Sequence, residues 1–184
     1  MPDELLDILD AKGNKTGRVK SRNLAHSDGS WHATVHIWMY NKKGEVLLQK
    51  RADNLYVYPG LWDISCAGHI SAGQTPDGAA IRELSEELGI KIDPKLLKKV
   101  KIQKQKYRIS GKPGFQNNEL NHLYLFQFDG AVKELDFKDG EVGKVKFEPV
   151  DRFEKEVTDP ILSKKFVPHN YYPLIISAIR AQLS

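Results

Sequence analysis

The sequence predicts an α/β protein in which one mixed β-sheet lies between α-helices. Segments rich in β-branched and aromatic residues flank a single early helical pattern, and further helical patterns follow residue 150. This order is typical of a sheet covered by helices on both faces. At 184 residues, 40% of them apolar, we expect one domain over 1–184, with an N-terminal β-hairpin extension in 1–30 and C-terminal helices in 150–184.

The first third of the chain is predicted to consist of strands and turns. A hairpin opens the chain, because a turn-forming Ala-Lys-Gly-Asn stretch separates two strand-like runs. Further strands follow wherever β-branched and aromatic residues concentrate. The expected strands are residues 5–10, 16–20, 32–40, 45–51 and 62–67, with loops at 22–30 and 52–61.

A helix is predicted directly after a glycine-rich loop. Thr75 is a suitable N-cap, Pro76 suits the first helical position, and Gly89 suits the residue that ends the helix. Between these limits, one face is apolar and another is acidic. The apolar face carries Ile81, Leu84 and Leu88, and the acidic face carries Glu83, Glu86 and Glu87.

The second half of the chain is predicted to return to strands and to end in helices. Residues 91–97 form a turn or a short strand, and the Gly/Pro-containing segment 110–118 forms a loop. The last helix has an amphipathic pattern. The expected strands are 100–109, 119–129 and 141–149, and the expected helices begin at 151 and span 173–183.

The acidic helix face indicates a site for a divalent cation. Three carboxylates on adjacent turns repel one another, and a hard cation such as Mg²⁺ or Mn²⁺ would turn that repulsion into binding. Arg82 places a fixed positive charge beside them, and glycines in the preceding loop allow the backbone to approach a ligand closely. We expect this face to open into a cleft, although a simple solvated face has the same pattern.

The segment 68–90, here called the signature segment, resembles the signature of the Nudix hydrolases, G-x5-E-x7-R-E-U-x-E-E-x-G-U, with U a bulky apolar residue. The chain departs from it at one position, where Gln74 replaces a glutamate; its neutral amide can still accept a hydrogen bond, for instance from Arg82. The positions that match are Gly68, Arg82, Glu83, Leu84, Glu86, Glu87, Gly89 and Ile90. The resemblance implies the Nudix fold, a mixed sheet in an α/β/α sandwich.

The resemblance also implies a reaction, the hydrolysis of a phosphoanhydride in a nucleoside diphosphate-linked or other organic diphosphate. Mg²⁺ or Mn²⁺ would bind to Glu83, Glu86 and Glu87, with Gly68 and His69 as further candidate ligands, and Arg82 would orient the glutamates. The catalytic base stays open among Glu83, Glu87, Glu119 and Glu141. Lys50 and Arg51, at a strand end, are candidates for contact with the phosphates.

Other segments are similar to isopentenyl-diphosphate isomerase, a branch of the same superfamily. They are Trp31-His32, Leu48 to Arg51, Pro59 to Trp62, Gly68-His69 and Asn118-Glu119. The isomerase requires a cysteine directly before the Gly-His pair, where this chain has Ala67. Cys66 is one residue early, and on a strand that shift turns the thiol to the other face. Candidate metal residues of the isomerase are kept at His26, His32, His69 and Glu119.

Composition limits the remaining function classes. A net charge of +4 suits an anionic small molecule, and no basic helix or basic and aromatic stripe indicates nucleic acid. One cysteine and an acidic start without an apolar stretch lead us to expect a cytoplasmic protein that spans no membrane. A homodimer is an open alternative. So are an isomerase and a non-catalytic nucleotide-binding module, the latter supported only by Gln74.

Overall fold

The computed structural model of the protein describes residues 3–108, 114–137 and 140–183. Within these residues, seven strands form a mixed sheet in the order β5-β4-β3-β8-β7, with β6 paired to β3 and β9 paired to β4. β3 and β8 run parallel, and the other pairs are antiparallel. The strands are β3 (His32–Tyr40), β4 (Glu45–Arg51), β5 (Trp62–Asp63), β6 (Cys66–His69), β7 (Lys98–Arg108), β8 (Gln116–Gln127) and β9 (Val142–Pro149).

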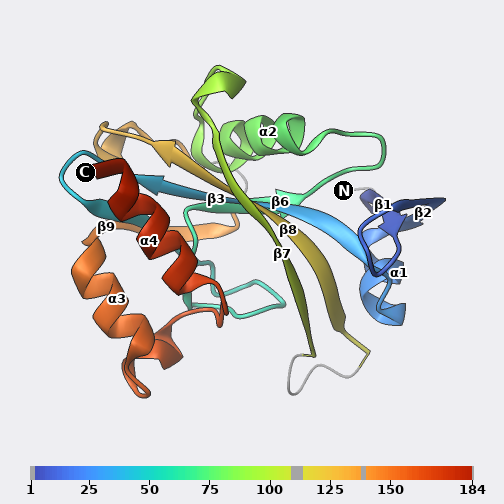
Figure 1. The fold of residues 1–184 in the computed structure, drawn as a ribbon. Coiled ribbons are helices and arrows are strands. Elements are labelled where there is room, and N and C mark those ends of the chain that lie inside the picture. The colour runs from blue at the N-terminus through green and yellow to red at the C-terminus, as the bar shows by residue number, and fades with distance from the viewer. Residues whose placement is uncertain (1–2, 109–113, 138–139, 184) are drawn as a thin grey trace.

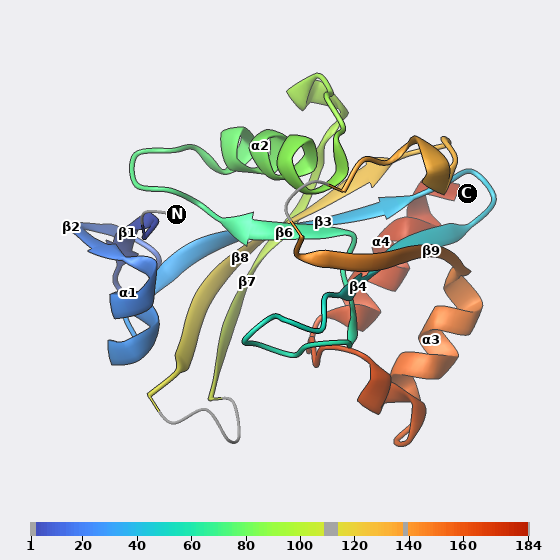
Figure 2. The ribbon, with the colours of Figure 1, turned by 180° about the vertical axis from the view of Figure 1, so that it is seen from behind.

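Helices cover both faces of this sheet, as predicted. Figures 1 and 2 show α2 (Pro76–Leu88) on one side, with α3 (Val150–Thr158) and α4 (Tyr172–Leu183) on the other. Successive residues of a strand point to opposite faces. Ile37 therefore belongs to the core beneath α2, with Leu84 and Leu88, whereas Trp38 belongs to the core beneath α3 and α4, with Phe153.

The N-terminal hairpin consists of β1 (Leu5–Leu9) and β2 (Lys15–Ser21), and it leads into a helix that was not predicted from the sequence. The prediction of a loop over 22–30 is wrong, because α1 occupies Arg22–Asp28. The Ser21 side chain caps it by accepting from the backbone N–H of Leu24, and Gly29 ends it with a φ of 72°. A helix of seven residues is too short to show an apolar period, so only its caps could have indicated it.

The other differences concern the limits of elements. The single strand predicted over 62–67 is two short strands, β5 and β6, and the stretch after α2 holds a 3-10 helix at Pro94–Leu96. β8 begins at Gln116, inside the loop predicted over 110–118, because residues 116–118 continue the pairing with β7. Residues 109–113 of the predicted strand and loop lie outside the described residues. The limits predicted for β3, β4 and α2 are confirmed.

Candidate active site

The helix of the signature segment is built as its sequence predicts. Thr75 accepts a hydrogen bond from the backbone N–H of Gly78 at 3.1 Å, and Pro76 occupies the first turn. Gly89 ends the helix in the left-handed region with a φ of 69°. These local signals fix where the acidic face begins and ends, independently of any charge at position 74.

Glu83 lies directly against the backbone of the strand that precedes the loop. A Cβ atom added to Gly68 would stand 1.9 Å from the carboxyl carbon and from one carboxyl oxygen of Glu83. Only glycine leaves room for that carboxylate. Burial raises the pKa of Glu83 to about 7, although the neighbouring Arg82 guanidinium acts in the opposite direction. Glu83 and Gly68, both predicted as metal-site residues, are therefore in contact.

Arg82 connects the helix carboxylates to the loop. Its Nη2 lies 2.8 Å from Glu83 Oε1 and donates to the His69 carbonyl at 2.9 Å, and its Nη1 donates to Glu86 Oε2 at 2.8 Å. The hydrogen bond suggested between Arg82 and Gln74 is not formed. Among the described residues, Gln74 Oε1 and Arg82 Nε are both buried and have no hydrogen-bond partner.

The acidic face is more enclosed than predicted. Glu83 is 8% exposed and Glu87 is 5% exposed, whereas the Glu86 side chain is 54% exposed. The prediction that the whole face opens to a cleft is therefore wrong for two of the three residues. Two buried carboxylates beside an exposed one form a donor set that a hard divalent cation fits, since such ions take carboxylate and carbonyl oxygens.

A second group of candidate ligands converges on the other face of the sheet. Each member offers one ligand atom, and these atoms all lie within 4.8 Å of one another. The members, which we call the His/Glu cluster, are His26 of α1, His32 of β3, His69 of β6 and Glu119 of β8. His32 and Glu119 are side by side because β3 and β8 are parallel neighbours, and His69 pairs with Thr34 of β3.

The distances and charges of the His/Glu cluster fit a metal ion. The Nε2 atoms of His26 and His69 are 3.2 Å apart, and Glu119 Oε1 lies 3.6 Å from His32 Nε2. Burial lowers the pKa of His26 to about 4 and that of His69 well below its ordinary value. Burial opposes ionisation of Glu119, yet the neighbouring His32 imidazole holds its pKa well below the usual range. Neutral imidazoles with one carboxylate are the donor set that Mn²⁺, Zn²⁺ or Fe²⁺ accepts.

The remaining predicted site residues lie at the end of β4 and beside it. Arg51 is already engaged, since its Nε donates to the Val57 carbonyl at 2.9 Å and its Nη1 lies 3.2 Å from Asp63. Lys50 is half-buried on β4. Glu141 is exposed, and its backbone carbonyl accepts a hydrogen bond from the Ala52 N–H. Glu141 therefore lies next to the loop after β4 and does not belong to the His/Glu cluster.

The register of β6 decides which face of the sheet the Cys66 side chain points to. Cys66 pairs with Ile37 and is fully buried in the core beneath α2, whereas Ala67 pairs with His36 and packs against the core beneath α3 and α4. The two side chains therefore point to opposite faces, as predicted. The face that carries His69 has a methyl group where the isomerase has its thiol.

A buried polar network on the same face as Ala67 was not predicted. His36 hydrogen-bonds the Tyr171 hydroxyl, and His169 contacts Asp63 at 2.8 Å. Burial lowers the pKa of His36 to about 4. His36 and Tyr171 are 135 residues apart in the chain, so no spacing in the sequence could have linked them.

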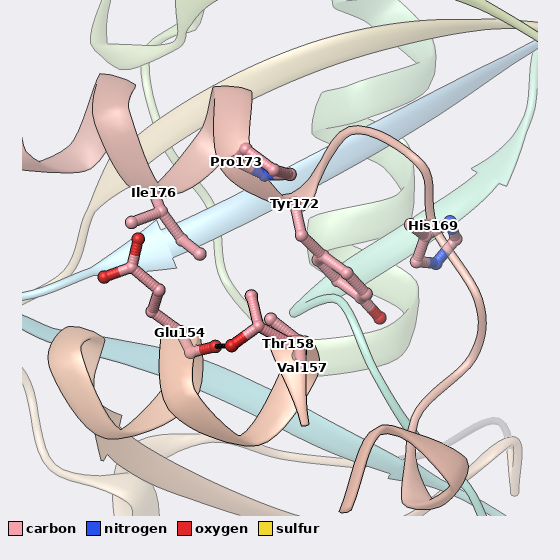
Figure 3. Close-up of a pocket in the computed structure, with 7 residues that line it drawn as sticks. All are labelled: Glu154, Val157, Thr158, His169, Tyr172, Pro173 and Ile176. Carbon is pink, nitrogen blue, oxygen red and sulfur yellow. Dashed lines mark hydrogen bonds between the residues drawn. The ribbon is translucent and has the colours of Figure 1, made fainter. Parts of the chain in front are cut away.

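A cavity of about 140 Å³ lies away from both groups of candidate ligands, between α3, α4 and the segment before α4 (Figure 3). Its acidic residue, Glu154, is paired with Arg180 at 2.7 Å. Its other lining residues are Val157, Thr158, His169, Tyr172, Pro173 and Ile176. We assign no ligand to it.

The comparison with known families decides the identity of the fold. Residues 30–169 match the family described as NUDIX domain. The chain belongs to the Nudix family. This confirms the resemblance seen in the signature segment, and it leaves the hairpin and α1, with His26, outside the matched range.

Relatives of this Nudix chain carry two kinds of name. It is 38% identical over 156 residues to Nudix hydrolase 3 of Arabidopsis thaliana, covering 83% of this chain but only 20% of that protein. It is 32% identical over 173 residues to an uncharacterized Nudix hydrolase of Clostridium acetobutylicum, covering 91% and 82%. It is also 32% identical over 128 residues to the isopentenyl-diphosphate Delta-isomerase of Serratia proteamaculans, covering 70% and 68%.

Solved structures confirm the Nudix fold. DR0079 of Deinococcus radiodurans superposes with a TM-score of 0.69 at 15% identity, covering 97% of this chain and 98% of that one. The NUDIX domain of Shewanella oneidensis NrtR, solved with ADP ribose, superposes with a TM-score of 0.58 at 15% identity, covering 83% and 88%. Within the described residues, no helix is long and apolar enough to cross a membrane.

Proposed function

We propose that this Nudix protein hydrolyses a phosphoanhydride bond in an organic diphosphate, such as a nucleoside diphosphate linked to a second group, with Mg²⁺ or Mn²⁺ as cofactor. The observation that carries the proposal is the contact between Glu83 and Gly68, with Arg82 joined to Glu83, Glu86 and the His69 carbonyl. This arrangement keeps oxygen ligands close together at a glycine backbone, where a bulkier residue would displace them.

The helix carboxylates would hold the cofactor. Glu83, Glu86 and Glu87 supply carboxylate oxygens from adjacent turns, and the Gly68 carbonyl is a further candidate ligand. A bound divalent cation supplies neutralisation of the diphosphate charge and a lowered pKa for the attacking water. Arg82 fixes the rotamers of Glu83 and Glu86, so the ligands are oriented before the substrate binds.

The proton acceptor is one of four glutamates. Glu83, with a pKa of about 7, has the affinity for a proton that a general base needs near neutral pH. Glu119, whose pKa is held low, suits the role of a ligand in the His/Glu cluster better. Glu87 and Glu141 complete the candidates. Lys50 and Arg51 would contact the phosphates, and Arg51 would share its charge with Asp63.

The His/Glu cluster favours a second candidate, an isomerase of isopentenyl diphosphate. Its residues are those that the resemblance to the isomerase identifies as metal residues, and a relative of that name shares 32% identity. The isomerase hypothesis requires an acid–base thiol that this chain lacks at that position, because Ala67 and not Cys66 faces the His69 side of the sheet. We therefore keep hydrolysis as the first candidate.

The test is a panel of nucleotides, nucleotide sugars, dinucleoside polyphosphates and isopentenyl diphosphate, each with Mg²⁺ or Mn²⁺. Metal-dependent release of phosphate or nucleotide, with a product mass that shows one anhydride cleaved, supports the proposal. Conversion of isopentenyl diphosphate to dimethylallyl diphosphate without phosphate release supports the isomerase instead. Binding of a nucleotide without turnover of any substrate supports a non-catalytic module.

The proposed partner is thus a small anionic molecule, in keeping with the net charge of +4. A cytoplasmic location and a homodimer remain predictions. Size-exclusion chromatography with light scattering checks the second, since a monomer of this chain has a mass of 20.9 kDa.

A further inference from the structure

The segment 4–7, which comprises Glu4 and the first three residues of β1, is bonded to the loop of the signature segment. We call this segment the N-terminal strap. Three hydrogen bonds join the strap to the loop: Ser71 Oγ to Glu4 Oε1 at 2.6 Å, the Ala72 N–H to the Leu5 carbonyl at 2.7 Å, and the Gly73 N–H to Asp7 Oδ2 at 2.9 Å. Figures 1 and 2 show the hairpin at the end of the sheet where this loop leads into α2. A segment outside the matched family range therefore holds the loop that positions the acidic helix.

This strap also brings a carboxylate to Arg82. Glu4 Oε1 lies 3.8 Å from Arg82 Nη2, the nitrogen that contacts Glu83. Both Glu4 and Arg82 keep less than a third of their side chains exposed, at 28% and 29%. Gln74, where the Nudix signature has a glutamate, adds no charge.

We propose that Glu4 is a positioning residue for the acidic helix and supplies, from the residue before β1, the carboxylate beside Arg82 that Gln74 does not supply. The inference rests on the proposed function, since it assigns the helix glutamates to a metal. In its proposed role, Glu4 touches neither the metal nor the substrate. It acts through Arg82.

The physical reason is a competition for the helix carboxylates. The Arg82 guanidinium and a divalent cation both attract Glu83 and Glu86. A guanidinium has several donors and can satisfy more than one carboxylate. A third carboxylate at Glu4 takes part of the Arg82 charge, and so leaves Glu83 and Glu86 more available to the cation. Without it, Arg82 holds the two ligands more strongly.

The test compares Glu4→Gln with Asp3→Asn. Glutamine is close in shape to glutamate and can still accept from Ser71 Oγ, so the strap is kept while the charge is lost. Asp3 is an exposed carboxylate one residue away, and its replacement removes the same charge from the same segment. Mn²⁺ binding is followed by electron paramagnetic resonance, and the binding class of the helix is identified as the one that Glu86→Gln weakens.

We expect Glu4→Gln to weaken that binding class about threefold to fivefold, as befits a partly exposed ion pair, and to leave the thermal midpoint where Asp3→Asn leaves it. The Mg²⁺ concentration for half-maximal hydrolysis rises by the same factor. A double-mutant cycle then combines Glu4→Gln with Arg82→Gln. If Glu4 acts through Arg82, it has no further effect on Mn²⁺ binding once the guanidinium is gone.

Three results would overturn the inference: equal Mn²⁺ binding in Glu4→Gln and the wild type, an equal loss in Asp3→Asn, or an undiminished effect of Glu4→Gln in the Arg82→Gln background. Each of these leaves hydrolysis by the wild type untouched. Failure of the wild-type protein to bind Mn²⁺ at the helix, or to hydrolyse any diphosphate, would instead remove the proposed function itself. The two failures are thus told apart by the wild-type arm.

Discussion

Glu83 and Gly68 occupy complementary space: the carboxyl group of one fills the volume that a side chain on the other would need. A Cβ atom at position 68 would lie 1.9 Å from the Glu83 carboxyl carbon. The contact joins the acidic helix α2 to strand β6, and it explains why β6 carries a glycine at this position. It also identifies the most sensitive backbone position of the candidate site.

We expect Gly68→Ala to lower the activity about a hundredfold, because Glu83 must move away and a displacement of about 1 Å at a catalytic centre can cost that factor. The measurement is kcat/KM on the best substrate of the panel, with circular dichroism to confirm folding. Gly143→Ala is the matched control, since a Cβ atom there meets its nearest neighbour at an ordinary 3.4 Å. Unchanged activity in Gly68→Ala would show that Glu83 is not needed in this position.

Replacement of the helix carboxylates should weaken the metal. Glu86→Gln and Glu87→Gln are expected to lower metal affinity and activity by a factor on the order of a hundred while the fold is kept, because each removes a charged oxygen ligand. Isothermal titration with Mn²⁺ and a rate measurement against Mg²⁺ concentration check this. Asp151→Asn, an exposed carboxylate on α3, serves as the control. Turnover like that of the wild type from either variant would contradict the metal assignment.

Metal binding should depend on pH through Glu83. Its pKa is raised to about 7, so at pH 6 most of the carboxyl group carries a proton that a cation must displace. Affinity for Mn²⁺ is therefore expected to rise between pH 6 and pH 8 and to level off above pH 8, with protons released on binding. The folding stability of the metal-free protein depends on pH in the opposite direction. A carboxyl group whose pKa is raised on folding stabilises the fold at low pH, and that contribution is lost as the pH rises from about 4.5 through 7.

Calorimetric titration in buffers of different ionisation enthalpy counts the protons. Glu83→Gln should remove the proton release in this range. A Mn²⁺ affinity independent of pH between 6 and 8 would show that Glu83 is ionised throughout or is not a ligand.

The His/Glu cluster should hold a metal of its own. We expect the purified protein to retain a divalent transition metal, and His26→Ala and Glu119→Gln each to lower the retained amount, because each removes one of four converging ligands. Inductively coupled plasma mass spectrometry of protein purified without chelator measures the content. His122→Ala, a histidine on the opposite face of β8, is the control. Equal metal content in all variants would contradict a site in the cluster.

The cysteine should not take part in the reaction. Cys66→Ala is expected to leave hydrolysis nearly unchanged, because the thiol is buried beneath α2 and faces away from His69. The opposite change, Ala67→Cys, places a thiol on the face that carries His69, and we expect it to confer weak isomerisation of isopentenyl diphosphate. Complete loss of turnover in Cys66→Ala would contradict the register argument and strengthen the isomerase reading.

Local patterns in the sequence were enough to predict the acidic helix and its ends. Thr75, Pro76 and Gly89 act on their immediate neighbours through capping and backbone preference, so their effect does not depend on the rest of the fold. The opposite facing of Cys66 and Ala67 was also predictable, because alternation along a strand is a local property. The Nudix family itself followed from the same segment.

Only the tertiary structure decided which residues far apart in the chain come into contact. The resemblance to the isomerase had named His26, His32, His69 and Glu119, but their convergence depends on strand order, because β3 lies between β6 and β8 and α1 packs at their end. Two further features likewise depend on neighbours that no periodic pattern in the sequence predicts. They are the burial of Glu83 and Glu87 and the ion pair between Arg51 and Asp63. Glu4 reaches Arg82 only because β1 bonds to the loop of the signature segment, and such long-range contacts are determined by the packing of whole elements rather than by local sequence.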